Sequence, residues 1–306
     1  MHGSQSFVPD PRNEHVKVWL NGELVPRNEA KVSVLDAGFM LGDGVWEGLR
    51  LVNGRLAFIG AHLERLYAGA RALAIDVPMT PQALTEALYA TVRANGMHDG
   101  VHLRLMVTRG LKATPSQDPR STASGATIVI VAEHKEQDPA VRARGLALVT
   151  SSYRTSTPDV FDMALNTHSR LNLIRALVQV ANLGADEALM LDPHGFVASC
   201  NATNFFIVSR GAVCTSTGRY CFRGITRGHV IALCREHGIA VEERDVTLAE
   251  VQGAGEAFVT GTYGGVTAVA TLDGRRIGTT TPGPLTRRLE TLYQARLREE
   301  GADSRS

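Results

Sequence analysis

Two periods in the order of apolar and polar residues predict the elements of this chain. Strands are predicted where residues alternate or stay apolar over a short run, as at residues 101–109 and 127–133. Helices are predicted where apolar residues recur every three or four positions, as at residues 61–74 and 171–183. Because strands and helices are intermixed from end to end, the pattern predicts an α/β (α+β) fold.

Turn residues and glycines mark the remaining elements. The Asn21-Gly22 pair predicts a hairpin between residues 16–20 and 23–25. A strand is expected over residues 31–35, and the glycine spacing after it predicts a tight loop over residues 38–44. Toward the C-terminus the pattern predicts strands at residues 146–151, 187–191, 196–198, 205–208 and 212–215, and helices at residues 227–237 and 285–298.

Residues 134–144 are polar and charged and contain Asp138-Pro139, which predicts a linker between domains. The 306 residues of the chain are enough for two separate cores. We therefore expect a small N-terminal α/β domain over residues 1–133 and a larger C-terminal domain over residues 145–306.

Composition narrows the classes of function. The apolar fraction is 44% and the net charge is +1, from 32 basic and 31 acidic residues, so no charge field favours nucleic acid or a membrane surface. No apolar run approaches the ~18 residues of a membrane span, and the first residues lack a signal-peptide pattern. The four cysteines show neither CxxC spacing nor the density of a disulfide scaffold, which favours a reduced, cytoplasmic protein. No cluster of His, Asp and Glu has the spacing of metal ligands.

Three segments carry residues that suit an anion. Thr226, after Gly224, is expected to cap a helix whose first N–H groups would face a phosphate. Residues 260–265 bring hydroxyls and glycines to the end of a strand. Arg65 lies one turn from His62 on a helix and has the fork geometry that phosphate binding uses. Taken singly, these segments are equally explained by a plain helix cap, a turn and a solvated arginine.

The order of these segments resembles the class IV aminotransferase family, which includes branched-chain and D-amino-acid aminotransferases and aminodeoxychorismate lyase. The resemblance covers about residues 16–297. The runs that carry it are Asp36-Ala37-Gly38, Gly42-Asp43-Gly44-Val45-Trp46-Glu47-Gly48-Leu49-Arg50, His62-Leu63-Glu64-Arg65-Leu66, Gly184-Ala185-Asp186-Glu187-Ala188, Asn204-Phe205-Phe206, Gly224-Ile225-Thr226-Arg227 and Thr260-Gly261-Thr262.

This resemblance implies the fold-type IV architecture, in which a small α/β domain and a larger domain with a β-barrel-like core hold pyridoxal 5′-phosphate (PLP) between them. It also implies a homodimer. Four residues correspond to those that hold the cofactor phosphate, and a further three correspond to the substrate pocket. The phosphate residues are Arg65, Ile225, Thr226 and Thr262, and the pocket residues are Trp46, Tyr263 and Gly264.

Two functional residues of the family are replaced in this chain. The Schiff-base lysine corresponds to Asn166, and a shift of register would not supply one because no lysine follows Lys135. An asparagine amide is not nucleophilic and cannot form the covalent link to PLP. The glutamate that keeps the pyridine nitrogen of PLP protonated corresponds to Ser199, which carries no charge.

Three hypotheses follow from these replacements. In the first, the protein acts on amino acids with non-covalent PLP or its amine form, pyridoxamine 5′-phosphate (PMP), and His168 transfers protons; a structural role also explains that histidine. In the second, the fold performs a lyase or isomerase step, with Cys200 among the polar contacts. In the third, the protein is an inactive homologue that binds a phosphate-bearing ligand or a partner protein.

The sequence says little about the substrate. Phe39 and Trp46 are candidates for aromatic pocket walls, although simple packing also explains both. Arg104, on a predicted strand, is suited to pair with a substrate carboxylate or with a neighbouring acid. The loop at residues 110–115 lacks the Arg-x-His pair of the D-specific branch, which favours an L-amino acid or 2-oxo acid.

Overall fold

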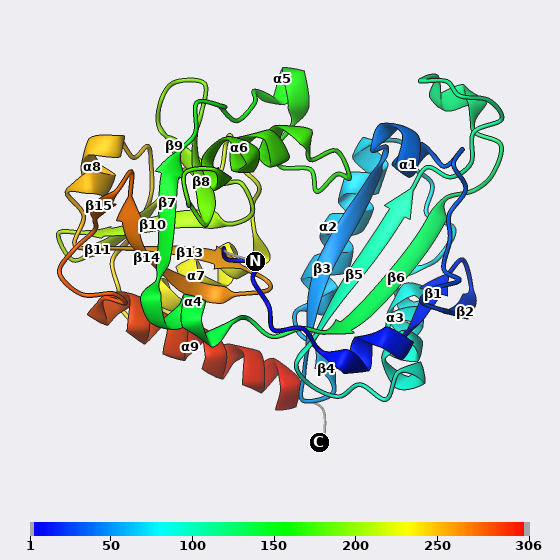
Figure 1. The fold of residues 1–306 in the computed structure, drawn as a ribbon, viewed down its shortest axis with the longest axis horizontal. Helices are drawn as coiled ribbons and strands as arrows, with labels where there is room; N and C mark the ends of the chain where they lie inside the picture. The colour runs from blue at the N-terminus through cyan, green and yellow to red at the C-terminus, as the bar shows by residue number, and fades with distance from the viewer. Residues whose placement is uncertain (1–2, 303–306) are drawn as a thin grey trace. The chain divides into compact units, whose positions relative to one another are not determined.

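In the computed structural model, which describes residues 3–302, the chain forms two compact units (Figure 1). The six-stranded unit contains residues 9–136, 165–170 and 298–302. The nine-stranded unit contains residues 3–8, 137–164 and 171–297. Each unit has its own sheet and apolar core, and the domain boundaries expected at residues 133 and 145 stay a prediction.

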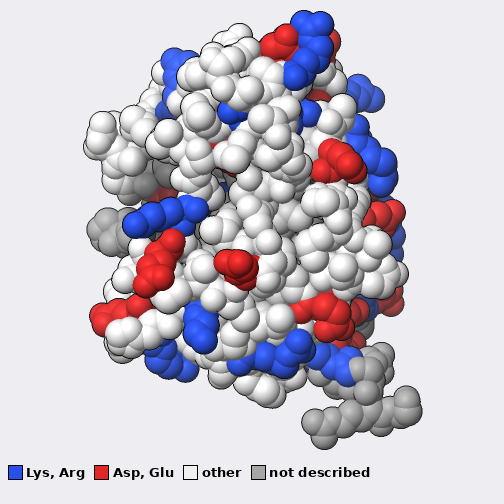
Figure 2. Space-filling view, turned by 90° about the vertical axis from the view of Figure 1, so that its right-hand side faces the viewer, with Lys and Arg blue, Asp and Glu red and all other residues white. Residues whose placement is uncertain are grey.

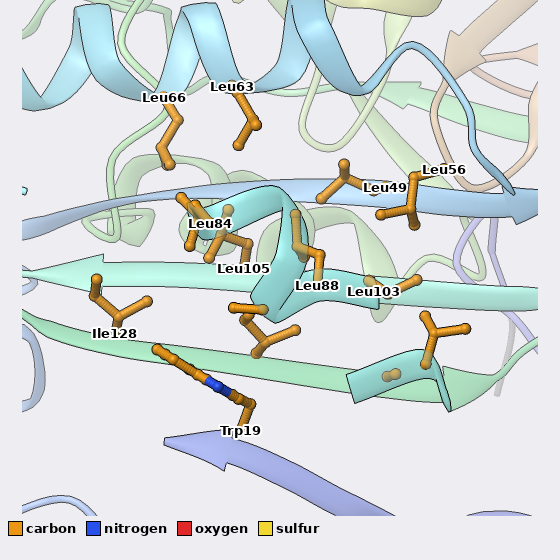
Figure 3. Packing of buried hydrophobic residues seen from close by; sticks show 14 of the residues in the cluster. Trp19, Leu49, Leu56, Leu63, Leu66, Leu84, Leu88, Leu103, Leu105 and Ile128 are labelled. Carbon is orange, nitrogen blue, oxygen red and sulfur yellow. The ribbon is translucent and has the colours of Figure 1, made fainter. Parts of the chain in front are cut away.

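The six-stranded unit is an antiparallel sheet in the order β2-β1-β6-β5-β3-β4, with α2 and α3 packed on it. Leu63 and Leu66 of α2 point toward the sheet, where Leu49 and Leu103 lie in the core (Figure 3). All four are less than 5% exposed, because helix and strand periods bring their apolar positions to one layer. The elements are Pro11–His15 (a 3-10 helix), β1 (Lys17–Leu20), β2 (Glu23–Pro26), α1 (Ala37–Leu41), β3 (Gly44–Val52), β4 (Arg55–Leu56), α2 (Ile59–Ala72), α3 (Pro81–Ala94), β5 (Val101–Thr108), Pro119–Ser121 (a 3-10 helix) and β6 (Thr127–His134).

The nine-stranded unit is a mixed sheet in the order β12-β11-β10-β13-β14-β7-β8-β9, and β15 pairs with β14. Three helices pack against it: α6 on β8, α7 on β13 and α4 on β14. The elements are α4 (Pro139–Arg144), β7 (Leu146–Thr150), α5 (Pro158–Phe161), α6 (Leu171–Ala181), β8 (Glu187–Leu191), β9 (Val197–Cys200), β10 (Asn204–Ser209), β11 (Ala212–Thr215), α7 (Ile225–Glu236), β12 (Val241–Glu243), α8 (Leu248–Gln252), β13 (Glu256–Gly261), β14 (Gly265–Leu272), β15 (Arg275–Arg276) and α9 (Pro284–Ala302, in this unit up to Leu297).

Two local predictions were wrong. Residues 31–35 form no strand; the chain there is irregular and leads to a bridge between Asp36 and Leu111. The predicted loop at residues 38–44 contains α1, because the Asp36 carboxylate accepts from the Gly38 N–H at 2.8 Å and Gly42, at φ 67°, ends the helix. Within the predicted linker, which stays a prediction, residues 139–144 form α4, and the Asp138 side chain caps this helix.

Charges of both signs are scattered over the face drawn in Figure 2, in keeping with the small net charge of the sequence. No helix within residues 3–302 has both the length and the apolar character needed to cross a membrane.

Candidate functional site

The segment that contains Asn166, residues 165–170, is held against the start of β3 by backbone hydrogen bonds. Trp46 N donates to Asn166 O at 3.0 Å and His168 N donates to Gly44 O at 2.9 Å. The Trp46 indole N–H donates to Thr167 O at 3.0 Å. These bonds extend β3 by a further short pairing and fix Asn166 beside Trp46.

The Asn166 side chain is 6% exposed, and its hydrogen-bonding groups are engaged. Its Nδ2 donates to Trp46 O at 2.5 Å and lies 3.5 Å from Glu47 Oε1. Its Oδ1 accepts from Arg170 Nη2. An amide can donate and accept at once, so asparagine satisfies both neighbours in a way that an ammonium group cannot.

Glu47 is the buried acid of this unit's polar cluster, and the sequence analysis assigned it no role. Its carboxylate, fully buried, accepts from Arg65 Nε at 2.7 Å and Nη2 at 2.6 Å, and lies 2.7 Å from His62 Nδ1. Burial raises the pKa of Glu47, but hydrogen bonds from Arg65 and His62 and their charges outweigh it and hold that pKa below 4.5. Arg65, predicted to bind phosphate, therefore uses two of its nitrogens on Glu47. The spacing of His62 and Arg65 on one helix face is the feature of the sequence that pointed toward a polar cluster here, although it did not identify Glu47.

The guanidinium groups of two arginines lie over the Trp46 ring. The guanidinium carbon of Arg104 lies 3.8 Å from the ring centroid, and that of Arg170 lies 5.2 Å away. Among the described residues, Arg104 has no acid within salt-bridge distance. Partial burial lowers the pKa of Arg104, while burial and then the Arg104 charge lower that of Arg170 to about 10. The structure thus brings Trp46 and Arg104, both predicted pocket residues, into contact.

His168 and Phe39 lie in the same unit but in different settings. The His168 Nε2 is 3.1 Å from Val45 O, and burial, then the Arg104 charge, lower the pKa of His168 to about 4. An imidazole with so low a pKa is a weak base near neutral pH. Phe39, on α1, is 70% exposed and lies at the surface of its unit.

In the nine-stranded unit, the start of α7 differs from its prediction. Gly224, not Thr226, is the N-cap residue, and no side chain caps the helix. Ile225 and Thr226 form its first turn, so their backbone N–H groups lie among those that a helix leaves unpaired. This uncapped start, at the positive end of a 12-residue helix, has the properties that bind anions.

Asn204 connects the start of α7 to the sheet. Its Nδ2 donates to Phe222 O at 2.7 Å and its Oδ1 accepts from Gly224 N at 3.2 Å, while its backbone is paired with Thr260 of β13. Thr260 is 1% exposed, and its hydroxyl has no hydrogen-bond partner within the described chain. The half-buried Thr262 follows in the turn after β13.

Tyr293 of α9 contacts both predicted phosphate segments of this unit. Its hydroxyl is 3.2 Å from Thr226 Oγ1, and its ring would lie 3.3 Å from a Cβ at Gly265. The sequence analysis did not find Tyr293, because a contact over 67 residues has no local signature.

Ser199 and Cys200 lie at the end of β9, where they are 4% and 3% exposed. Burial and the nearby Glu187 raise the pKa of the Cys200 thiol well above its ordinary value, so it stays protonated. Glu187 itself is 1% exposed, and burial raises its pKa from 4.5 to about 7. Tyr263, also buried, donates its hydroxyl to Ser6 O at 3.1 Å, and Gly264 follows it beside Gln137.

Comparisons with known proteins define the class. The family model described as amino-transferase class IV matches residues 44–272. The branched-chain-amino-acid aminotransferase-like protein 1 of Arabidopsis thaliana is 38% identical over 96% of the chain, and the chain spans about half (53%) of that relative's length.

Two solved structures are similar over the whole chain. A branched-chain aminotransferase from Thermoproteus uzoniensis with norvaline has a TM-score of 0.84 and 31% identity, covering 95% of this chain and 96% of that one. The branched-chain amino acid aminotransferase of T.th., solved with pyridoxamine 5′-phosphate, has a TM-score of 0.86 and 30% identity, covering 94% and 97%.

The predicted mixed α/β, fold-type IV architecture is therefore confirmed. The chain belongs to the class IV aminotransferase family and resembles its branched-chain members.

Proposed function

We propose that this protein binds PLP or PMP without a covalent link and acts on amino acids and 2-oxo acids. The observation that carries the proposal is Asn166, a buried amide with its donors and acceptor engaged, in the segment where the family has its Schiff-base lysine. A bound pyridoxal cofactor supplies an electron sink for reactions at the α-carbon of an amino acid.

The nine-stranded unit supports the phosphate part of this proposal. The uncapped first turn of α7, with Ile225 and Thr226, offers N–H donors. The Thr260 hydroxyl, buried without a partner among the described residues, and Thr262 offer further polar atoms nearby on β13 and its turn. We assign the phosphate to this group; Arg65, which the resemblance also implies, donates to Glu47 in its own unit.

Arg104 and Trp46 support an anionic substrate. A guanidinium that lacks an acid partner within the described chain and stacks on an indole is suited to a carboxylate, because a planar fork can bind both oxygens at once. Tyr263 and Gly264 are assigned to the same substrate by resemblance. The low pKa of His168 argues against it as the proton acceptor near neutral pH.

A second candidate, a lyase or isomerase, is favoured by one observation. Ser199 and the protonated Cys200 offer no charge at the position assigned to the pyridine nitrogen. A neutral ring is a weaker electron sink, which lowers the rate of reactions that need a full carbanion.

The partner we propose is a second copy of the chain. Leu171, Ile174 and Val178 are 65%, 53% and 61% exposed at helical spacing on α6, followed by Leu183 at 69%. Such an apolar stripe is unfavourable in water and suits a symmetric helix contact. A cytoplasmic location is supported by the four free cysteines, all of them buried.

The test is a binding titration with PLP and with PMP, followed by borohydride reduction. We expect saturable binding of both and no adduct on the chain. Thr262→Ala should weaken binding by about 10- to 100-fold, the value of one hydrogen bond to a charged group. The control Thr291→Ala removes an exposed hydroxyl that bonds only its own helix, at Arg287 O, and should bind normally. The absence of binding to the folded protein refutes the proposal.

If binding is found, the complex should be mixed with L- and D-amino acids in single-turnover experiments. Release of a 2-oxo acid supports the first candidate function, and release of ammonia or an isomerised product supports the second. His168→Ala should leave the rate near neutral pH unchanged, because its side chain is neutral and weakly basic there.

A further inference from the structure

Residues 3–8 are docked along the nine-stranded unit. The first described segment, blue in Figure 1, runs to the strands β13 and β14. Ser4 and Ser6 are only 3% and 2% exposed. Gly3 has φ 118°, and a Cβ there would lie 2.7 Å from Asp186 O, so the backbone approaches the start of β8 as closely as glycine allows.

Ser4 is anchored by Glu187. Its hydroxyl donates to Glu187 Oε1, while Thr203 Oγ1 donates to Glu187 Oε2 at 2.7 Å. The Thr203 methyl would lie 3.4 Å from a Cβ at Gly261. The buried carboxyl group of Glu187 therefore accepts hydrogen bonds both from residues 3–8 and from Thr203, in the turn beside the predicted phosphate segment.

Ser6 is anchored by Tyr263. The Ser6 carbonyl accepts from the Tyr263 hydroxyl at 3.1 Å and from Asp138 N at 3.3 Å. Phe7 continues the docking through a bridge with Gln137, whose amide nitrogen would lie 3.0 Å from a Cβ at Gly264. Residues 3–8 thus contact Tyr263 directly, while Gln137, which pairs with Phe7, lies beside Gly264.

The tyrosine hydroxyl has only one hydrogen to donate. A backbone carbonyl and a carboxylate oxygen are acceptors of the same kind, so Ser6 O uses the donor that a ligand carboxylate would need. We propose that residues 3–8 form a strap that competes with the ligand carboxylate for the Tyr263 hydroxyl. This inference rests on the proposed function, which assigns Tyr263 to the substrate.

Competition has a reciprocal consequence. A ligand that takes the Tyr263 hydroxyl loosens the strap, and a change that loosens the strap tightens the ligand by the same factor. Ser4→Ala loosens the strap without touching Tyr263. The matched control is Val8→Ala, in the same segment but 54% exposed.

The experiment uses 4-methylvalerate, an unreactive carboxylate, with the full chain and saturating PMP. We expect Ser4→Ala to bind the probe about 5- to 10-fold more tightly than the wild type, from the loss of one hydrogen bond to a buried acid, and Val8→Ala to bind like the wild type. In the wild type, saturating probe should speed hydrogen exchange at the amides of residues 4–8. In Tyr263→Phe, adding Ser4→Ala should no longer change probe affinity.

The outcomes separate the two claims. If the wild type binds PMP and the probe but Ser4→Ala binds no tighter, or exchange at residues 4–8 does not respond, the strap is refuted and the proposed function stands. If neither protein binds PMP or the probe, both are refuted. Probe binding to Ser4→Ala but not to the wild type supports the strap in its strongest form.

Discussion

Asn166→Lys places an amine at the position that the resemblance predicts for the family's Schiff-base lysine. The substitution removes the amide that donates to Trp46 O at 2.5 Å and the oxygen that accepts from Arg170. Each buried group left without its partner costs about 1–3 kcal/mol, and the longer side chain at a 6% exposed site adds about 1–3 kcal/mol of overpacking. We expect a loss of about 3–9 kcal/mol in urea unfolding, a large share of the ~5–15 kcal/mol that a folded protein has.

The new amine should be reactive. Burial lowers the pKa of a lysine, and so do the positive charges of Arg170 and Arg104. The negative charge of Glu47 would raise that pKa, but this charge is already paired with Arg65. A neutral amine attacks an aldehyde, so PLP followed by borohydride should mark residue 166, detected by peptide mass mapping. The wild type should carry no mark there.

Asn182→Lys is the control, since it makes the same change at an exposed residue just after α6. It should give no specific adduct. If folded Asn166→Lys binds PLP as tightly as the wild type and residue 166 stays unmodified, then that residue does not face the aldehyde. The alignment with the Schiff-base lysine would then be wrong.

Three further outcomes are expected. Burial raises the pKa of Glu187 from 4.5 to about 7, so the folded protein holds a proton there that the unfolded chain releases. The free energy of unfolding should therefore fall as the pH rises from about 4.5 through 7, by at most about 3 kcal/mol. Glu187→Gln should remove this pH dependence in urea unfolding. Ile174→Glu should turn a dimer into monomers in sedimentation, whereas Asn182→Glu should not; monomeric wild type would contradict the α6 contact. Leu103→Ala, fully buried on β5, should cost about 2–5 kcal/mol, against ~0.5 kcal/mol or less for Leu24→Ala, which is 38% exposed.

The periodicity of apolar residues predicted many of the helices and strands. The helices α2, α6 and α7 and the strands β5, β6 and β8 lie within a few residues of their predicted ranges, because each has an apolar face long enough to show its period. Short elements were missed for the opposite reason. The five residues of α1 and the six of α4 depend on a capping aspartate rather than on a repeated apolar face.

The site was less accessible from sequence, because its contacts join distant segments. The sequence pointed to Asn166, Trp46 and Arg104, and the structure brings them together. It gave no sign that Arg65 would pair with Glu47, or that Tyr293 would contact Thr226. A hydrogen bond between residues tens of positions apart depends on sheet order and helix docking, which no local pattern encodes.

The pair formed by Asn166 and Arg170 joins the position predicted for the Schiff-base lysine to Trp46, a predicted pocket residue. A protonated lysine at residue 166 could not accept a hydrogen bond from Arg170, and two cations at that distance would repel each other, which is why the pKa of the lysine should be lowered. The asparagine and the arginine are therefore compatible with each other in a way that a lysine and the arginine are not. We expect Asn166→Lys with Arg170→Leu to be more stable than the sum of the single variants, with a coupling of about 0.5–3 kcal/mol in urea unfolding. Simple additivity would mean that the contribution of Arg170 to stability does not depend on the residue at position 166.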